Sequence, residues 1–193
     1  MNKQLDALID RVHPALSVKS RALLSELAIE EDILAGTQFI ELGQVNNAEY
    51  FVLEGVVRSF MINEDGDQVT IAFYPEDYVL SPHVIRTQDE RSILNFEAIT
   101  ACKLLKLDAG RFSEHIRDDQ DIQDFANMVL RGELIRKVNK EIQLISQNSK
   151  ERLIQFRKDF HMLENRVPHS MIASYLGITP VSLSRLRKSL SIS

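Results

Sequence analysis

The sequence predicts an α+β fold: an N-terminal antiparallel β-roll with flanking helices, then one long helix, then a helix-turn-helix. Residues 29–107 contain short β-favouring runs separated by turn residues, which is typical of a jelly-roll-like sheet. Residues 121–146 keep apolar residues at helical spacing. We therefore expect a roll domain over 1–120, a dimerisation helix over 121–146 and a helix-turn-helix domain over 147–193.

The N-terminal elements follow from local patterns. Residues 3–27 carry leucines and isoleucines at helical spacing, and Pro14 divides them into two helices. The clearest hairpin joins residues 56–62 to residues 68–74. Its connection contains the pair Asp65-Gly66, which suits a turn that needs positive φ.

The long helix carries an apolar seam. Its members are spaced by alternating steps of three and four residues, with one polar interruption at Arg131, which is the pattern of a coiled coil. The seam consists of Met128, Ile135, Val138, Ile142 and Ile145. We expect it to pair with a second copy of the chain. The alternative is a helix that packs wholly on its own roll.

The C-terminal segment has the start and stop signals of two short helices. Ile172 and Leu176 give the first helix a buried stripe, and Gly177 follows where a residue with positive φ ends a helix. Thr179 can cap the second helix through its hydroxyl, and Pro180 suits its first position. These signals indicate a helix-turn-helix.

The second of these helices has two different faces. Its buried side holds Leu183, Leu186 and Leu190. The other side is small, basic and rich in hydrogen-bonding groups: Val181, Ser184, Arg185 and Lys188. Such a face fits the major groove of DNA, where arginine can bond guanine in a fork and lysine can reach phosphate. The alternative is a helical hairpin that only closes a core.

Charge is distributed unevenly along the chain. The net charge is −5, yet residues 149–193 hold eight Lys or Arg against three acidic residues. The basic charge thus falls on the helix-turn-helix, where it favours contact with phosphates.

The sequence lacks the residues that several other classes of protein require. The five histidines include no pair spaced by two, so a metal-binding His-x-His pair is missing and no metal site is expected. Cys102 is the only cysteine and is expected in a buried strand. Glycine patterns of hydrolases and phosphate-binding loops are missing as well, so we expect no enzyme. The sequence has no apolar run of about 20 residues, so we expect no membrane association and a cytoplasmic protein.

This order of elements resembles the Crp/Fnr superfamily of bacterial transcription regulators. Gly43 and residues 50–58 are similar to the roll signature of that family, and residues 90–92 and 98–107 to the end of its phosphate-binding cassette and its closing strand. The resemblance implies a homodimeric, sequence-specific regulator that binds double-stranded DNA, with RNA polymerase as a further partner. In such proteins a ligand in the roll changes how the long helices present the DNA-binding domains.

The cassette departs from the pattern of the cyclic-nucleotide-binding members. Those members open the cassette with Gly-Glu, which gives the phosphate close backbone N–H groups and the ribose a carboxylate. Leu80 and Ser81 stand there instead, and Pro82 removes another donor. We therefore expect no cyclic-AMP binding, no cofactor and an effector of open identity. The residues expected at an effector pocket are Leu80, Ser81, His83, Arg91 and Ser92.

The resemblance also assigns residues that contact DNA. Arg185 resembles the main base-contacting arginine, and Val181 stands where well-studied relatives have a glutamate, so the target sequence should differ. The full expected set is His169, Ser170, Thr179, Val181, Ser182, Ser184, Arg185 and Lys188. The alternative function is a ligand-sensing or scaffolding roll protein without DNA-binding activity.

Overall fold

The computed structural model describes residues 3–191 and gives the elements in chain order. The N-terminal half contains α1 (Lys3–Val12), α2 (Val18–Leu27), β1 (Ala28–Ile33), β2 (Gln38–Ile40), β3 (Ala48–Glu54), β4 (Val57–Ile62), β5 (Gln68–Tyr74), α3 (His83–Arg86), β6 (Thr87–Gln88), β7 (Arg91–Ser92) and β8 (Asn95–Ala98). The remainder contains β9 (Cys102–Asp108), α4 (Ala109–Asp118), α5 (Gln120–Ser146), α6 (Ser149–Asp159), the short 3₁₀ helix η1 (Leu163–Asn165), α7 (His169–Tyr175) and α8 (Pro180–Ser191).

The strands form an antiparallel roll, as the sequence predicts. One sheet has the order β1-β9-β3 and the other β2-β8-β4-β5, and the two-residue strands β6 and β7 pair separately. The expected hairpin joins β4 to β5, and Gly66 adopts a φ of 85° within it. Gly55 is required for another reason: it has a φ of 93°, and a Cβ there would lie 2.6 Å from Cys102 Sγ. Cys102 itself is buried in β9, as expected.

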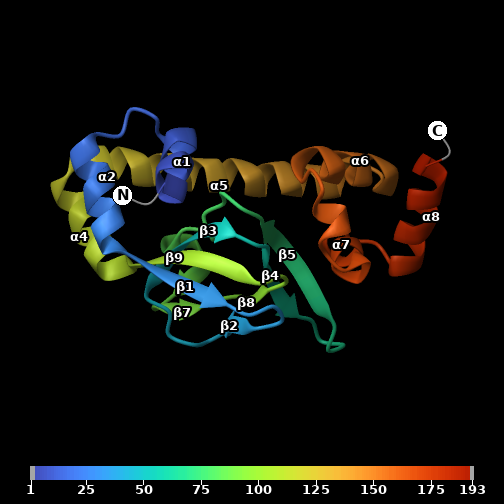
Figure 1. The fold of residues 1–193 in the computed structure, drawn as a ribbon. Helices are drawn as coiled ribbons and strands as arrows, with labels where there is room; N and C mark the ends of the chain where they lie inside the picture. Colours follow the sequence, from blue (N-terminus) through green and yellow to red (C-terminus); the bar gives the residue numbers. More distant parts are fainter. Residues whose placement is uncertain (1–2, 192–193) are drawn as a thin grey trace.

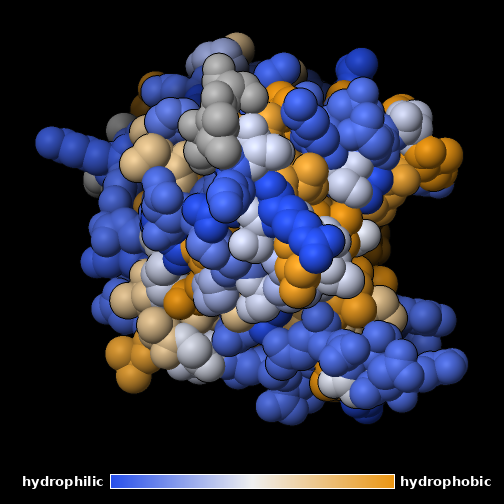
Figure 2. All heavy atoms as spheres, turned by 90° about the vertical axis from the view of Figure 1, so that its right-hand side faces the viewer, coloured by the Kyte–Doolittle hydropathy of each residue, from blue (hydrophilic) through white to orange (hydrophobic). Residues whose placement is uncertain are grey.

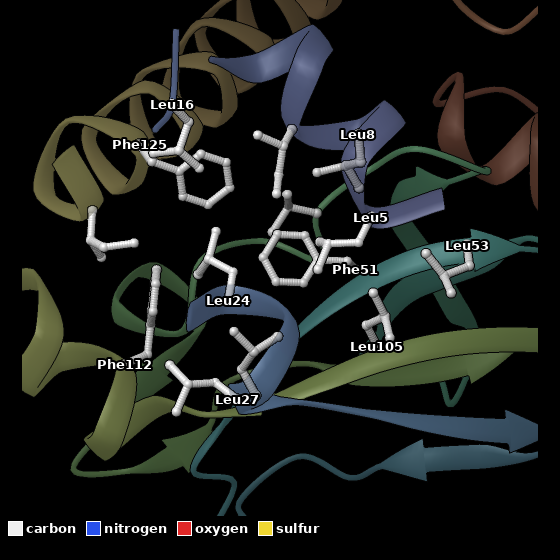
Figure 3. Packing of buried hydrophobic residues seen from close by; sticks show 14 residues of the cluster. Leu5, Leu8, Leu16, Leu24, Leu27, Phe51, Leu53, Leu105, Phe112 and Phe125 are labelled. Carbon is white, nitrogen blue, oxygen red and sulfur yellow. The ribbon is translucent and has the colours of Figure 1, made fainter. Parts of the chain in front are cut away.

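The N-terminal helices and α4 pack on one end of the roll. Pro14 lies between α1 and α2, and the side chain of Ser17 caps α2 by accepting from the Ser20 N–H. Figure 3 shows how the leucines of these two helices converge with Phe51 of β3, Phe112 of α4 and Phe125 of α5. This cluster fixes the first part of α5 against the outer face of the roll.

Helix α5 runs along the whole roll and connects its two ends (Figure 1). Its inner face buries Ile122, Phe125 and Glu133. The seam on its other face is open to solvent, with exposed fractions of 48% for Met128, 51% for Ile135, 45% for Val138, 54% for Ile142 and 80% for Ile145. The roll of the same chain therefore leaves this apolar stripe uncovered.

The three C-terminal helices lie at the far end of α5 (Figure 1). Helix α6 starts at Ser149 after a break at residues 147–148, where the Asn148 side chain and Glu151 form a capping box. Phe73 of β5 contacts the rings of Phe156, Phe160 and Tyr175, with centroids 5.2 to 6.2 Å apart. An aromatic cluster thus joins the roll to these helices.

Strand β5 is an edge strand of its sheet, and α7 covers that edge. The Ser174 hydroxyl accepts from the Thr70 N–H at 2.9 Å and donates to the Gln68 carbonyl at 3.3 Å. The edge groups of β5 thereby gain hydrogen-bond partners from the helix, which also prevents pairing with a foreign strand.

Candidate DNA-binding surface and effector pocket

The helix-turn-helix forms for the local reasons that the sequence indicates. Gly177 adopts a φ of 65°, Thr179 Oγ1 accepts from the Ser182 N–H at 3.2 Å, and Pro180 begins α8. Ile172 and Leu183 are buried between α7, α8 and α6. The two helices are thereby held at a fixed angle by one small core.

The outer face of α8 is free for a partner. Val181, Ser184, Arg185 and Lys188 are all exposed, and Val181 reaches 61%. Figure 2 faces this side of the molecule and shows mainly hydrophilic side chains, with apolar ones between them. The structure therefore brings together on one helix face the four outer residues that the sequence assigns to DNA.

The other expected DNA contacts border this face. His169 and Ser170 are exposed at the start of α7, and Thr179 is exposed beside the start of α8, with Ser182 half-buried. The Thr179 and Ser182 hydroxyls lie 2.9 Å apart. His169 Nδ1 is 2.9 Å from Arg187, so its ring orientation is fixed by α8.

Arg187 itself belongs to the domain's internal ion pairs. It bridges to Glu164 at 2.6 Å, and Glu164 also accepts two hydrogen bonds from Arg157, at 2.7 and 3.1 Å. The Arg157 guanidinium holds the pKa of Glu164 below its usual range, and Arg187 adds to this effect. Arg187 thus ties α8 to the preceding helices, whereas Arg185 projects outward.

Further polar contacts hold the C-terminal helices in place. Arg166 forms a bidentate pair with Glu76, one bond being 2.7 Å, and this pairing lowers the pKa of Glu76. Arg152 donates to the Leu176 carbonyl at 2.9 Å. Together with the aromatic cluster, these contacts hold α6 and α7 against each other and against the roll.

The five residues expected at an effector pocket do not share one surface. Leu80, Ser81 and Ser92 are buried, and Arg91 is exposed and donates to the Gly43 carbonyl at 2.8 Å. The Ser92 hydroxyl donates a hydrogen bond to the Leu94 carbonyl, at 2.6 Å. His83 lines a cavity outside the roll, and the other four do not contribute to its wall. This arrangement gives no support to a single pocket built from all five.

Arg86 occupies the space between the two sheets. It is 1% exposed and donates to the carbonyls of Ser81 and Ala48 and to Asn46 Oδ1, the first and last at 3.0 and 2.9 Å. The rings of Tyr50 and Phe96 lie 5.6 and 5.7 Å from its guanidinium carbon. A side chain of the protein therefore fills part of the interior of the roll.

A buried hydrogen-bonded chain joins this interior to α5. Tyr74 and Ser81 share a hydrogen bond of 2.5 Å, and the Ser81 hydroxyl donates to Glu133 at 3.1 Å. Glu133 is 3% exposed and accepts from Arg136 at 2.7 Å. Burial, together with the charge of Glu133, raises the pKa of Tyr74 to about 12, so this phenol stays protonated.

Sequence reasoning missed Arg86, Glu133 and Glu49, which lines the cavity beside His83. Buried charged residues are rare, so composition gives no signal for the first two. Glu49 does have a signal in the sequence. It stands two residues before Phe51 on β3, so both side chains lie on the strand face that the helices cover.

Two further features of the described residues concern metal binding and membrane spanning. Among residues 3–191 there is no cluster of three or more side chains suited to a metal ion. Within the same range, every helix is too short or too polar to cross a membrane.

A two-sheeted roll joined by one long helix to a helix-turn-helix defines a two-part architecture. No protein-family model and no curated protein matches the chain. Several solved structures do, and the chain has the fold of the Crp/Fnr superfamily.

Three of these structures come from different organisms. FixK2 from Bradyrhizobium japonicum has a TM-score of 0.74 at 20% identity, over 86% of this chain and 85% of that one. A putative Crp/Fnr-family transcriptional regulator from Eubacterium rectale gives 0.70 at 15% identity, covering 93% and 85%. The c-di-GMP responsive global regulator CLP of Xanthomonas campestris gives 0.69 at 14% identity, covering 88% and 89%.

Proposed function

We propose that this protein is a cytoplasmic, homodimeric regulator of transcription that binds DNA in a sequence-specific manner and is not an enzyme. The observation that carries the proposal is the exposed outer face of α8, with Arg185 and Lys188 flanked by Val181 and Ser184. Its size and chemistry suit the major groove. The likeness to Crp/Fnr regulators supports the same function. RNA polymerase is then the expected further partner.

The exposed seam on α5 supports the dimer. Monomeric proteins seldom leave a long apolar stripe in water, and two copies of the stripe are self-complementary in a two-fold interface. Pairing along α5 would place two copies of α8 for successive major grooves, about 34 Å apart on one face of the DNA. We accordingly propose the division into a roll over 1–120, a dimerisation helix over 121–146 and a DNA-binding domain over 147–193.

We also propose that the roll does not sense cyclic nucleotides in the way that the cassette of other members does. Leu80 and Ser81 stand where the cassette chemistry needs glycine and glutamate, and both are buried. Arg86 fills space between the sheets and already has carbonyl partners. Arg91, the arginine left from the cassette, is exposed and donates to the Gly43 carbonyl.

Selection from a library of random DNA duplexes tests the function. The purified 193-residue chain should enrich a motif of two inverted half-sites, with centres about one helical turn apart. A variant with Lys19→Ala serves as a control, because Lys19 is an exposed cation on α2, at the opposite end of the molecule from α8 (Figure 1). Failure to enrich any motif would favour the alternative, a ligand-sensing or scaffolding roll without DNA binding.

A further inference from the structure

A cavity of about 290 Å³ lies outside the roll, between β3 and the helices α4 and α5. Phe51 and Val79 form its wall on the roll side, Phe112 comes from α4 and Phe125 from α5. It is separate from the space between the sheets, because Phe51 packs with the helices while its neighbour Tyr50 packs between the sheets. Benzene fits a cavity of about 150 Å³, and ligand pockets start near 300 Å³. The volume therefore suits a small molecule.

One carboxylate stands out in this mainly apolar wall. Both oxygens of Glu49 accept from the backbone N–H of His83, at 2.8 Å. A carboxylate has about four acceptor positions, so this single donor leaves capacity for another. The His83 ring is engaged elsewhere, since its Nε2 lies 2.6 Å from the Asn46 carbonyl. Glu49 is thus the charged acceptor that a ligand in the cavity would meet, beside the polar side chains of Ser113 and Asn127.

The nearby cation does not use up this capacity. Arg86 lies close enough to lower the pKa of Glu49, but its hydrogen bonds go to Ser81, Asn46 and Ala48. Burial dominates and raises the pKa of Glu49 to about 7, against the opposing effects of the His83 N–H and Arg86. A hydrogen-bond donor placed in the cavity would stabilise the charged form of Glu49 and so oppose the effect of burial on its pKa.

We propose that this cavity binds a small apolar molecule whose head group donates hydrogen bonds, an alcohol or an amine, with Glu49 as the acceptor. The ligand would touch Phe125 and Val129 on α5, the helix that carries the exposed seam. As the effector of the regulator proposed above, it would act on the helix that positions the helix-turn-helix. In that respect the inference rests on the proposed function.

Three probes with one ring and different head groups test the site: 2-phenylethylamine, 2-phenylethanol and phenylacetate. Each is titrated into the 193-residue chain at pH 8 without DNA, and saturation-transfer NMR gives the dissociation constant. The amine and the alcohol should bind saturably. Phenylacetate should bind at least about tenfold more weakly than the amine, because its carboxylate would face that of Glu49.

Two variants assign the binding to the cavity. Glu49→Gln keeps the shape and removes the charge, so the amine should lose about tenfold in affinity, phenylacetate should gain and the alcohol should change little. Ile116→Trp fills the cavity and should weaken all three probes. Leu34→Trp makes the same kind of enlargement at a site that is 78% exposed, and should change none. Circular dichroism verifies that each variant is folded.

The outcomes separate the two proposals. Absence of saturable binding, equal binding of amine and phenylacetate, or unchanged binding in both Glu49→Gln and Ile116→Trp would overturn the ligand site. Because the titrations contain no DNA, a protein that binds the probes as described but enriches no DNA motif would retain the site and lose the regulator function. A protein that enriches a motif but binds no probe would retain the regulator function and lose the ligand site.

Discussion

The ammonium group of Lys140 in α5 donates a hydrogen bond to the backbone carbonyl of Tyr175, at the end of α7. The same nitrogen lies 3.2 Å from the centre of the Tyr175 ring. The long helix therefore contacts the helix-turn-helix through a cation that is largely removed from water. Burial lowers the pKa of Lys140 to about 7, and the charge of Arg152 contributes. This contact between α5 and α7 is thus sensitive to protonation.

The stability of the folded protein should depend on pH through this lysine. An unfolded lysine keeps its proton to about pH 10.4, whereas Lys140 in the folded chain releases it near pH 7. The unfolded state binds more protons between these values, so the free energy of unfolding rises with pH across that window. Urea denaturation at pH 6.5 and pH 9 should show a contribution of about 1–3 kcal/mol, which Lys140→Met removes.

The matched control for this measurement is Lys19→Met, at an exposed lysine of α2. It should retain the wild-type difference between the two pH values, when all proteins are compared at one concentration. An identical pH difference in wild type and Lys140→Met would show that the folded chain keeps Lys140 protonated throughout.

The dimer should depend on the seam of α5. Ile142 is 54% exposed, and Ile142→Glu would place two carboxylates against each other across a two-fold interface. Sedimentation velocity should show a dimer for the wild type and a monomer for the variant. Ile62→Glu makes the same change at a residue of similar exposure, 56%, on the β4–β5 hairpin, and should remain dimeric. A monomeric wild type would remove the model of two half-sites.

Substitutions of the two basic residues on the outer face of α8 should change DNA binding in different ways. Arg185→Ala should cost about 1–3 kcal/mol in specific binding and relax the preference at one base pair of each half-site. Lys188→Ala should weaken specific and nonspecific DNA alike and lower the salt slope by about one unit. Selection on random duplexes and titrations at several salt concentrations measure both effects. An unchanged motif and affinity for Arg185→Ala would mean that α8 does not enter the groove as proposed.

Cyclic nucleotides should fail to bind the roll. Leu80 and Ser81 lack the chemistry of the cassette, and Arg86 holds space between the sheets through its bonds to Ser81 and Ala48. Calorimetric titration with cyclic AMP and cyclic GMP should give no binding in the micromolar range. A saturable signal that disappears in Arg91→Ala would contradict this expectation.

The helices and turns of this protein were determined by its sequence, because they depend on neighbouring residues. Pro14 separates α1 from α2, Gly66 permits the hairpin turn, and Gly177 with Pro180 ends one helix and begins the next. The spacing of Leu183 in α8 likewise predicts which side is buried. These features need only backbone sterics, capping and hydrophobic periodicity, which act over a few residues.

The interior of the roll was decided only by the tertiary structure. Residues 80, 81, 91 and 92 lie near one another in the sequence, yet the folded chain buries three of them and exposes Arg91. Arg86 reaches carbonyl groups up to 38 residues away, and Glu133 meets Ser81 across 52 residues. A buried charge is stable only where it has partners. Where distant parts of the chain supply them, as Ala48 does for Arg86, local pattern carries no record of those partners.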